Sequence, residues 1–148
     1  MPSLVSDTEK AELQIIFADI FDTFKRSITV HKEPIKTFSS VDVNFIFGYG
    51  ESSQSENVTY TPQSQSFFAT ISYRFSDSDT DYVEDINSYV PGSIVKIKVE
   101  EDCKDYISTG GKTEHIEFDG KKFNVISKEI TSNFLGISYY VFFVQMSQ

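Results

Sequence analysis

The sequence predicts an α+β fold that is mostly β: an N-terminal amphipathic helix followed by a small antiparallel β-barrel or sandwich with a long projecting loop. Apolar residues recur every three or four positions in the first 25 residues, which is the period of a helix. After Arg26 they alternate with polar residues, which is the period of a strand. The length of 148 residues is that of one domain, so we expect a single domain over 1–148.

The N-terminal helix is expected over about residues 7–25. Ser6 and Glu9 have the spacing of a capping box, and Lys25 places positive charge at the end that the helix dipole favours. The apolar stripe along one face consists of Leu13, Ile16, Phe17, Ile20, Phe21 and Phe24. We expect this stripe to be buried, and Phe17, Phe21 and Phe24 are the candidate partner interface.

The β-domain is expected over about residues 27–146. The alternating segments are 28–30, 41–47, 67–75, 95–99, 116–118 and 123–125. We expect Pro34 to end the first of them, because proline donates no backbone hydrogen bond. Asp119-Gly120 is a strong hairpin-turn signal between the last two. The run 137–144 is apolar on both faces, which is typical of a strand between two layers.

Two polar segments interrupt the strands. Residues 50–66 are rich in Ser and Gln and predict a projecting loop, although a short strand over 57–61 would make an extended hairpin instead. The candidate channel-lining residues in it are Glu51, Ser53, Gln54, Glu56, Thr59, Gln63 and Gln65. Residues 76–88 form an acidic segment, in which Tyr82 and Ser88 stand where a calcium loop needs Gly and Glu. We therefore expect a solvated acidic loop there.

The charge balance restricts the class of partner. Lys and Arg number 13 against 22 Asp and Glu, which gives a net charge of −9. This balance disfavours broad nucleic-acid binding and docking on an anionic membrane surface, both of which need basic residues. The N-terminal residues lack a secretion signal and no apolar run is long enough to span a membrane, so we expect a soluble protein made in a cytoplasm. Cys103 is the single cysteine, and its acidic neighbours should raise the pKa of its thiol.

Motifs for catalysis or metal binding are missing from the sequence. His31 and His115 are the two histidines; we expect His31 on the polar face of a strand and His115 beside Glu114 and Glu117 without a further ligand nearby. We therefore expect no catalytic residue, no cofactor and no metal. A hydrolase that uses only carboxylates remains an alternative, since paired carboxylates suffice for some reactions. Its candidate residues are Asp77, Asp79, Asp81 and Glu84.

Several segments together resemble a known family. The strand Ser27–Lys32 follows the helix, and the polar segment 50–66 interrupts the strands. The last two apolar segments read Ile116-Glu117-Phe118-Asp119-Gly120-Lys121-Lys122-Phe123-Asn124-Val125-Ile126 and Gly136-Ile137-Ser138-Tyr139-Tyr140-Val141-Phe142-Phe143-Val144. In this combination the chain resembles the head-closure (stopper) and neck connector proteins of tailed bacteriophages. Those proteins are short acidic chains with a helical segment, a small β-barrel and a loop that projects into a central channel.

The resemblance implies a structural virion protein of the neck, present in the host cytoplasm during assembly. Its subunits would form a ring, with twelve expected, that joins head to tail and retains packaged DNA. The implied partners are the portal or adaptor protein, adjacent tail and neck proteins and copies of the chain itself, with no membrane. DNA would pass through the lumen without sequence-specific binding, because an acidic lumen repels phosphate. The alternative is a small acidic binding module or inhibitor that mimics nucleic acid or binds a basic partner.

Overall fold

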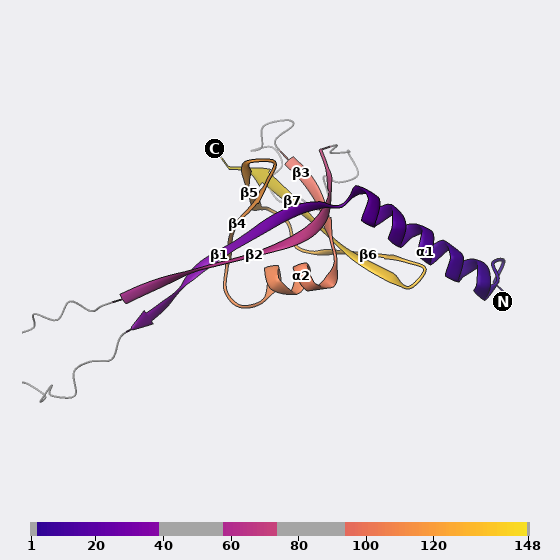
Figure 1. The fold of residues 1–148 in the computed structure, drawn as a ribbon, viewed down its shortest axis with the longest axis horizontal. Coiled ribbons are helices and arrows are strands. Elements are labelled where there is room, and N and C mark those ends of the chain that lie inside the picture. Colours follow the sequence, from indigo (N-terminus) through magenta and orange to yellow (C-terminus); the bar gives the residue numbers. More distant parts are fainter. Residues whose placement is uncertain (1–2, 39–57, 74–93, 148) are drawn as a thin grey trace, which may run out of the picture.

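The computed structural model describes residues 3–38, 58–73 and 94–147. The elements in chain order are α1 (Asp7–Phe24), β1 (Arg26–Phe38), β2 (Val58–Ser72), β3 (Ile94–Val99), α2 (Glu101–Ser108), β4 (Thr113–Phe118), β5 (Lys121–Val125), β6 (Ile130–Phe134) and β7 (Ile137–Met146). The predicted fold class is confirmed: an N-terminal helix precedes a mostly antiparallel β-structure (Figure 1). The predicted strand 41–47, the acidic loop 76–88 and the carboxylates suggested for a hydrolase lie outside the described residues.

The strands close into a barrel. β1 pairs with β2 and β4, β2 with β3, β4 with β5, and both β3 and β5 pair with β7, so these six strands form a closed cycle. The remaining strand, β6, does not belong to this cycle. It pairs antiparallel with residues 137–141 of β7. Closure removes the unpaired edges that an open sheet would expose.

The core fills the interior of this barrel and extends to one outer patch. Its buried members are Ile28, Val30, Ala69, Val95, Ile97, Val99, Cys103, Ile116, Phe118, Phe123, Phe142 and Val144. On the outer face, Val141 and Phe143 form a second buried cluster with Ile94. Alternate residues of β7 therefore pack on opposite faces, and the prediction that this run lies between two layers is confirmed.

The hairpin between β4 and β5 has the turn that its sequence predicts. Asp119 and Gly120 both have positive φ, 52° and 70°, which is the conformation of a type I′ turn. The register aligns Phe118 with Lys121 and Ile116 with Phe123. Because this turn matches the twist of the strands, it places Phe118 and Phe123 in stacked contact, with ring centroids 4.0 Å apart.

The short helix α2 is an element that the sequence does not predict. Its eight residues make two turns, too few for a helical period to be recognised, and the sequence pattern there indicates only acidic surroundings for Cys103. The helix places Cys103 in the barrel core, where its side chain is 1% exposed. Burial raises the pKa of the Cys103 thiol to about 12. The expected direction is thus confirmed, but the cause is burial rather than the acidic neighbours.

The first strand is longer than predicted. Pro34 does not end it: β1 continues to Phe38, and the register with β2 shifts between Lys32 and Ile35. A bulge at this point accommodates a residue that donates no hydrogen bond to the partner strand. Beyond the pairing of Lys32 with Thr113, β1 continues beside β2 alone. We call this projecting two-stranded ribbon, residues 33–38 and 58–63, the arm (Figure 1).

A buried lysine fixes the base of the arm. The Lys32 side chain donates hydrogen bonds to the carbonyl oxygens of Thr109 and Gly111, which follow α2, and its ammonium lies 5.1 Å from the ring centroid of Tyr106. Burial lowers the pKa of Lys32. The backbone N–H of Glu33 also donates to the carbonyl of Lys112, at 3.0 Å. These contacts fix where the arm leaves the barrel.

We expect Cys103 to resist alkylation in the folded protein. At about pH 8 its reaction with iodoacetamide should be at least a hundredfold slower in buffer than in denaturant, because the folded thiol is both buried and protonated. The stabilising effect of the neutral thiol is complete below its ordinary pKa of 9.0 and is lost as the pH rises toward 12. Chemical unfolding of the protein and its Cys103→Ala variant at several alkaline pH values measures this difference. Equal pH profiles would contradict it.

Candidate functional site: exposed apolar surfaces at two ends

The N-terminal helix begins with the predicted cap. The Ser6 hydroxyl accepts from the N–H of Glu9 at 3.3 Å, and the Glu9 carboxylate accepts from the N–H of Ser6 at 2.8 Å. Two N–H groups without partners in the helix are thereby satisfied, and the hydrogen bond from the Ser6 N–H is the largest cause of the lowered pKa of Glu9. The helix ends at Phe24, one residue before the predicted end, and Lys25 is its C-cap.

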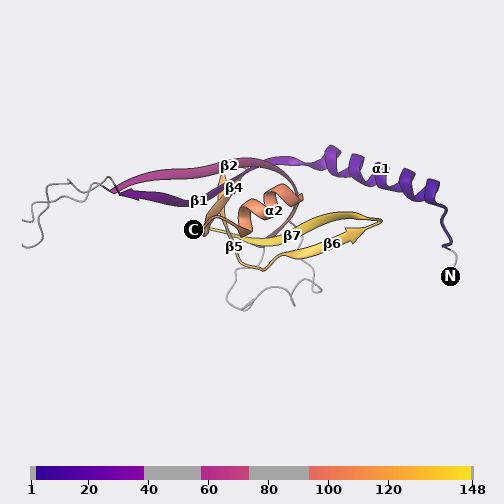
Figure 2. The same ribbon diagram turned by 90° about the horizontal axis from the view of Figure 1, so that it is seen from below.

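One side of α1 packs on the β6–β7 hairpin. The rings of Phe17 and Phe134 lie 4.2 Å apart at 57°, and those of Phe21 and Tyr139 lie 4.8 Å apart at 25°. The Gln14 amide donates to the carbonyl oxygen of Leu135 in the hairpin turn. These contacts attach the helix to the part of β7 that extends beyond the barrel (Figure 2).

The prediction that the whole helix stripe is buried is wrong. Phe21 is buried at 5% exposure and Phe17 is half-buried. The exposed members are Leu13 at 36%, Ile16 at 52%, Ile20 at 46% and Phe24 at 63%. The reason is geometric: α1 leaves the barrel at its edge, so a two-stranded hairpin covers only part of an apolar face that runs the length of the helix (Figures 1 and 2). The periodicity of the sequence identifies the apolar face of a helix, but it does not show which residues of that face pack against another element.

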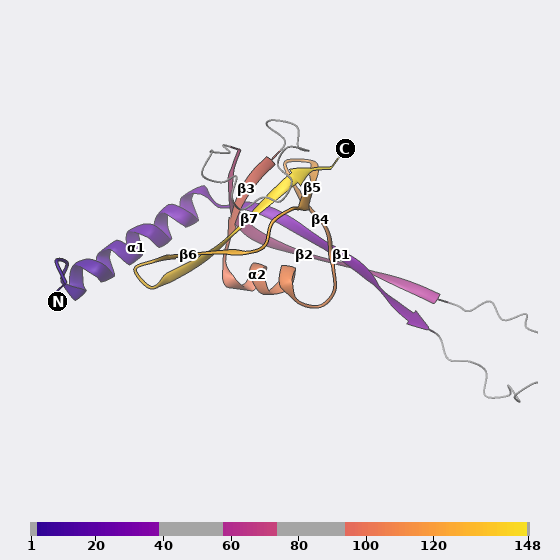
Figure 3. The same cartoon turned by 180° about the vertical axis from the view of Figure 1, so that it is seen from behind.

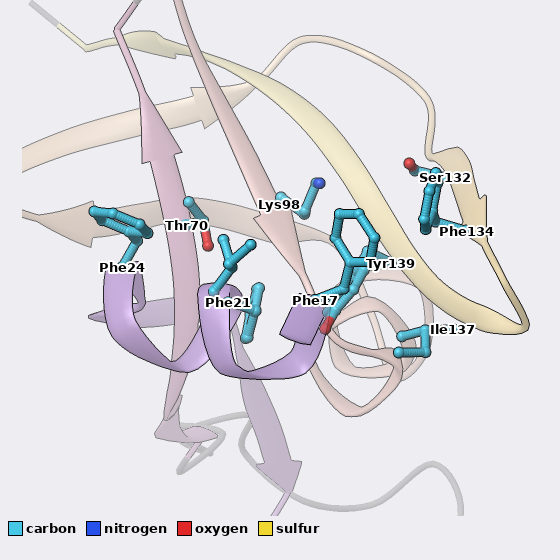
Figure 4. Close-up of a pocket in the computed structure, with 10 residues that line it drawn as sticks. Phe17, Phe21, Phe24, Thr70, Lys98, Ser132, Phe134, Ile137 and Tyr139 are labelled. Atoms are coloured by element: carbon cyan, nitrogen blue, oxygen red, sulfur yellow. The ribbon is translucent and has the colours of Figure 1, made fainter. Parts of the chain in front are cut away.

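The exposed face borders a groove of about 210 Å³. Its lining residues are Phe17, Ile20, Phe21, Phe24, Thr70, Lys98, Ser132, Phe134, Ile137 and Tyr139. Figure 4 shows Phe24 at one end of the groove and Phe134 with Ile137 at the other. All three candidate interface residues of the helix are therefore brought to one concave, mostly apolar surface.

Two polar groups mark the floor of this groove. The Thr70 hydroxyl is shielded from solvent and has no hydrogen-bond partner in the described chain. The Lys98 ammonium lies 5.4 Å from the ring centroid of Tyr139. Burial is the largest cause of the raised pKa of Tyr139, followed by the charges of Glu100 and Asp22. The groove thus combines apolar walls with the Lys98 ammonium and a shielded hydroxyl.

The arm is the second exposed apolar surface. Phe38 and Tyr60, which are 67% and 55% exposed, lie on one face of the ribbon, and Ile35, which is 52% exposed, lies on the other. Lys36 covers Tyr60 only in part, with its ammonium 5.7 Å from the ring centroid. Isolated two-stranded ribbons are marginally stable in water, so an arm of this kind gains stability when another surface covers it.

Three of the candidate channel residues lie in a strand rather than in a loop. Thr59, Gln63 and Gln65 belong to β2, where they pair with Thr37, Lys32 and Val30, so the prediction of a loop over 58–66 is wrong. Backbone hydrogen bonds to β1 hold these residues in a strand. Because such bonds do not require apolar side chains, the polar sequence of this segment gives no strand signal. The alternative of a strand over 57–61 in an extended hairpin is nearer to the structure. The remaining candidates Glu51, Ser53, Gln54 and Glu56 lie outside the described residues.

The two surfaces lie at opposite ends of the molecule. In Figure 1, α1 extends to one side of the barrel and the arm extends to the other, and the view from behind in Figure 3 shows the same arrangement. The helix surface and the arm surface are therefore too far apart to cover one another within one chain.

Comparisons with protein-family models, with curated proteins and with solved structures return no match to this chain. Neither helix in the described part of the chain combines the length and the apolar character that crossing a bilayer requires. Function is therefore inferred from the geometry of the molecule.

We expect substitutions on the two sides of α1 to differ in their effect on folding. Phe21→Ala should lower the free energy of unfolding of the isolated subunit by about 3 kcal/mol, since it removes a buried ring. Ile16→Ala should change it by less than about 0.5 kcal/mol, because that side chain is exposed. Urea denaturation followed by circular dichroism measures both. Equal losses for the two variants would mean that the helix packs differently.

Proposed function

We propose that this protein is a ring-forming structural subunit of a tailed-phage neck, a head-closure connector between portal and tail. The observation that carries the proposal is the pair of exposed apolar surfaces, one on α1 and one on the arm, at opposite ends of the same chain. Exposed patches of this kind on a small protein are typical of interaction sites.

The positions of the two surfaces favour a head-to-tail contact between copies. If the arm of one subunit occupies the α1 groove of the next, each subunit uses two different surfaces, and repetition of the contact generates a ring when the rotation closes. Such a contact would cover Phe38 and Tyr60 of one copy and Ile20 and Phe24 of its neighbour.

Charge favours this pairing over a symmetric dimer of helices. α1 contains five carboxylates and one lysine, which gives a formal charge of −4. Two such helices placed together would repel one another. In the described arm beyond Lys32, Glu33 and Lys36 cancel, so the arm approaches the acidic helix without a charge penalty.

The composition supports the placement in a neck. A ring of subunits that each have a net charge of −9 would surround a lumen with negative potential, which repels DNA phosphates and lets the duplex pass without adhering. The resemblance of the strand and hairpin segments to head-closure proteins points to the same partners: the portal or adaptor protein on one side and tail proteins on the other. Like charges also explain why such a subunit would remain monomeric at low salt and assemble on a partner ring.

We expect assembly to depend on groove and arm residues in a predictable way. The purified protein should sediment as a monomer at low salt and form rings when it is mixed with the portal or adaptor encoded beside it. Ile20→Ser and Phe38→Ser should each abolish ring formation with little loss of stability, since both side chains are exposed. Ile15→Ser is the matched control, because Ile15 is 70% exposed and does not line the groove. Analytical ultracentrifugation and negative-stain electron microscopy measure the outcome.

A mixture of the two defective variants provides a sharper test. The intact arm of the Ile20→Ser variant should still bind the intact groove of the Phe38→Ser variant, but the pair cannot propagate. In the presence of the portal or adaptor, the mixture should therefore give paired subunits but no ring, while each variant alone gives neither pairs nor rings. A tight dimer of the unmodified protein that forms without a partner and ignores both substitutions would contradict the ring and favour the acidic binding module.

A further inference from the structure

The two histidines of the sequence meet on the outer face of the barrel. The β1–β4 register aligns His31 with His115 and Thr29 with Glu117. Because side chains alternate along a strand, His31, His115 and Glu117 point away from the core that Val30 and Ile116 enter. The expectation that His115 has no further ligand nearby is wrong, because the register joins residues 84 positions apart.

The three side chains are close enough to share one ion. The imidazole rings of His31 and His115 are stacked, with centroids 4.4 Å apart at 19°. Ligand atoms of His31, His115 and Glu117 all lie within 4.8 Å of one another, and each residue is half-buried. The chain supplies two imidazole nitrogens and one carboxylate oxygen at a single place on rigidly paired strands.

One of these nitrogens lacks a partner. The His31 Nε2 atom is shielded from solvent and makes no hydrogen bond in the described chain, although the Glu117 carboxylate oxygen lies 3.4 Å away. A lone pair on this nitrogen and a carboxylate oxygen repel one another at that distance unless a proton or a metal ion lies between them. A bound cation would satisfy both groups, and buried polar atoms in folded proteins are rarely left unsatisfied.

We propose that His31, His115 and Glu117 form a binding site for a divalent transition metal ion, with Zn²⁺ as the ion that the donor set fits best. Zn²⁺ takes imidazole and carboxylate ligands in tetrahedral geometry, and three protein ligands with a water in the fourth position is a common zinc arrangement. Ca²⁺ and Mg²⁺ prefer oxygen donors alone, so the two nitrogens select against them. The barrel fixes the backbone positions of the three ligands, and rotation of the stacked imidazole rings about their side-chain torsions would direct both nitrogens at one ion.

Charged residues near the site both oppose and favour the binding of a cation. Lys122 is paired with Glu117 across the β4–β5 hairpin and opposes a cation there. Burial, followed by the nearby His31 and Lys122, lowers the pKa of His115, although Glu114 and Glu117 act in the opposite direction. The site links β1 to β4 where the arm leaves the barrel, so a bound ion would tie the arm base to the β4–β5 hairpin.

Metal titration of the full-length chain tests the site. Isothermal titration with Zn²⁺ should give one ion per chain, and Co²⁺ should produce the visible absorption of a tetrahedral site. His31→Ala and His115→Ala should each abolish the Co²⁺ spectrum, and Glu117→Gln should weaken Zn²⁺ binding at least about tenfold. Glu114→Gln is the matched control, because it removes a carboxylate from the same strand without removing a ligand. Circular dichroism would show that each variant is folded.

Thermal unfolding gives a second measurement. Saturating Zn²⁺ should raise the melting temperature of the unmodified protein and of Glu114→Gln, but not that of the histidine variants, since only a site present in the folded state stabilises it. Absence of Zn²⁺ and Co²⁺ binding by the folded protein would overturn the proposal. Equal binding by the unmodified protein and both histidine variants would also overturn it, because the ion would then bind elsewhere. Both experiments use the isolated chain, so their outcome does not depend on ring assembly.

Discussion

The rest of the structure depends on the pairing of β7. This strand bonds β3 along one edge and β5 and β6 along the other, and its alternate residues enter two different buried clusters. The β3–β7 pairing closes the barrel, which fixes the curvature and register of the strands. Because closed sheets have no free edges, the surfaces left for interaction are the extensions that leave the barrel.

Two of these extensions follow directly from strand lengths. The start of β7, residues 137–139, continues past its pairing with β3 and forms with β6 the platform on which Phe17 and Phe21 of α1 pack. β1 and β2 likewise continue past their neighbours and form the arm, whose base is fixed by the buried Lys32. The β6–β7 hairpin is too narrow to cover the whole apolar face of α1, and nothing in the described chain covers Phe38 and Tyr60 of the arm. These exposed apolar side chains are the physical basis for the proposed subunit contact.

The proposed metal site lies at the start of one extension. Its ligands come from β1 and β4, the last pair of strands before β1 continues into the arm. An ion there would act on the direction of the arm, as Lys32 does from inside the barrel. The inner and outer faces of one strand would then both contribute to the angle at which neighbouring subunits meet.

The sequence by itself determined the local structure. The capping box of Ser6 and Glu9, the Asp119-Gly120 turn and the alternating strands depend on residues that are close along the chain, so their patterns suffice to predict them. Tertiary structure decided how much of the helix stripe is covered, that residues 58–66 extend a strand, and that His31 meets His115. These outcomes depend on which strands pair and in what register. Pairing is a free-energy balance over the whole barrel, and it leaves no periodic signal at the positions it joins.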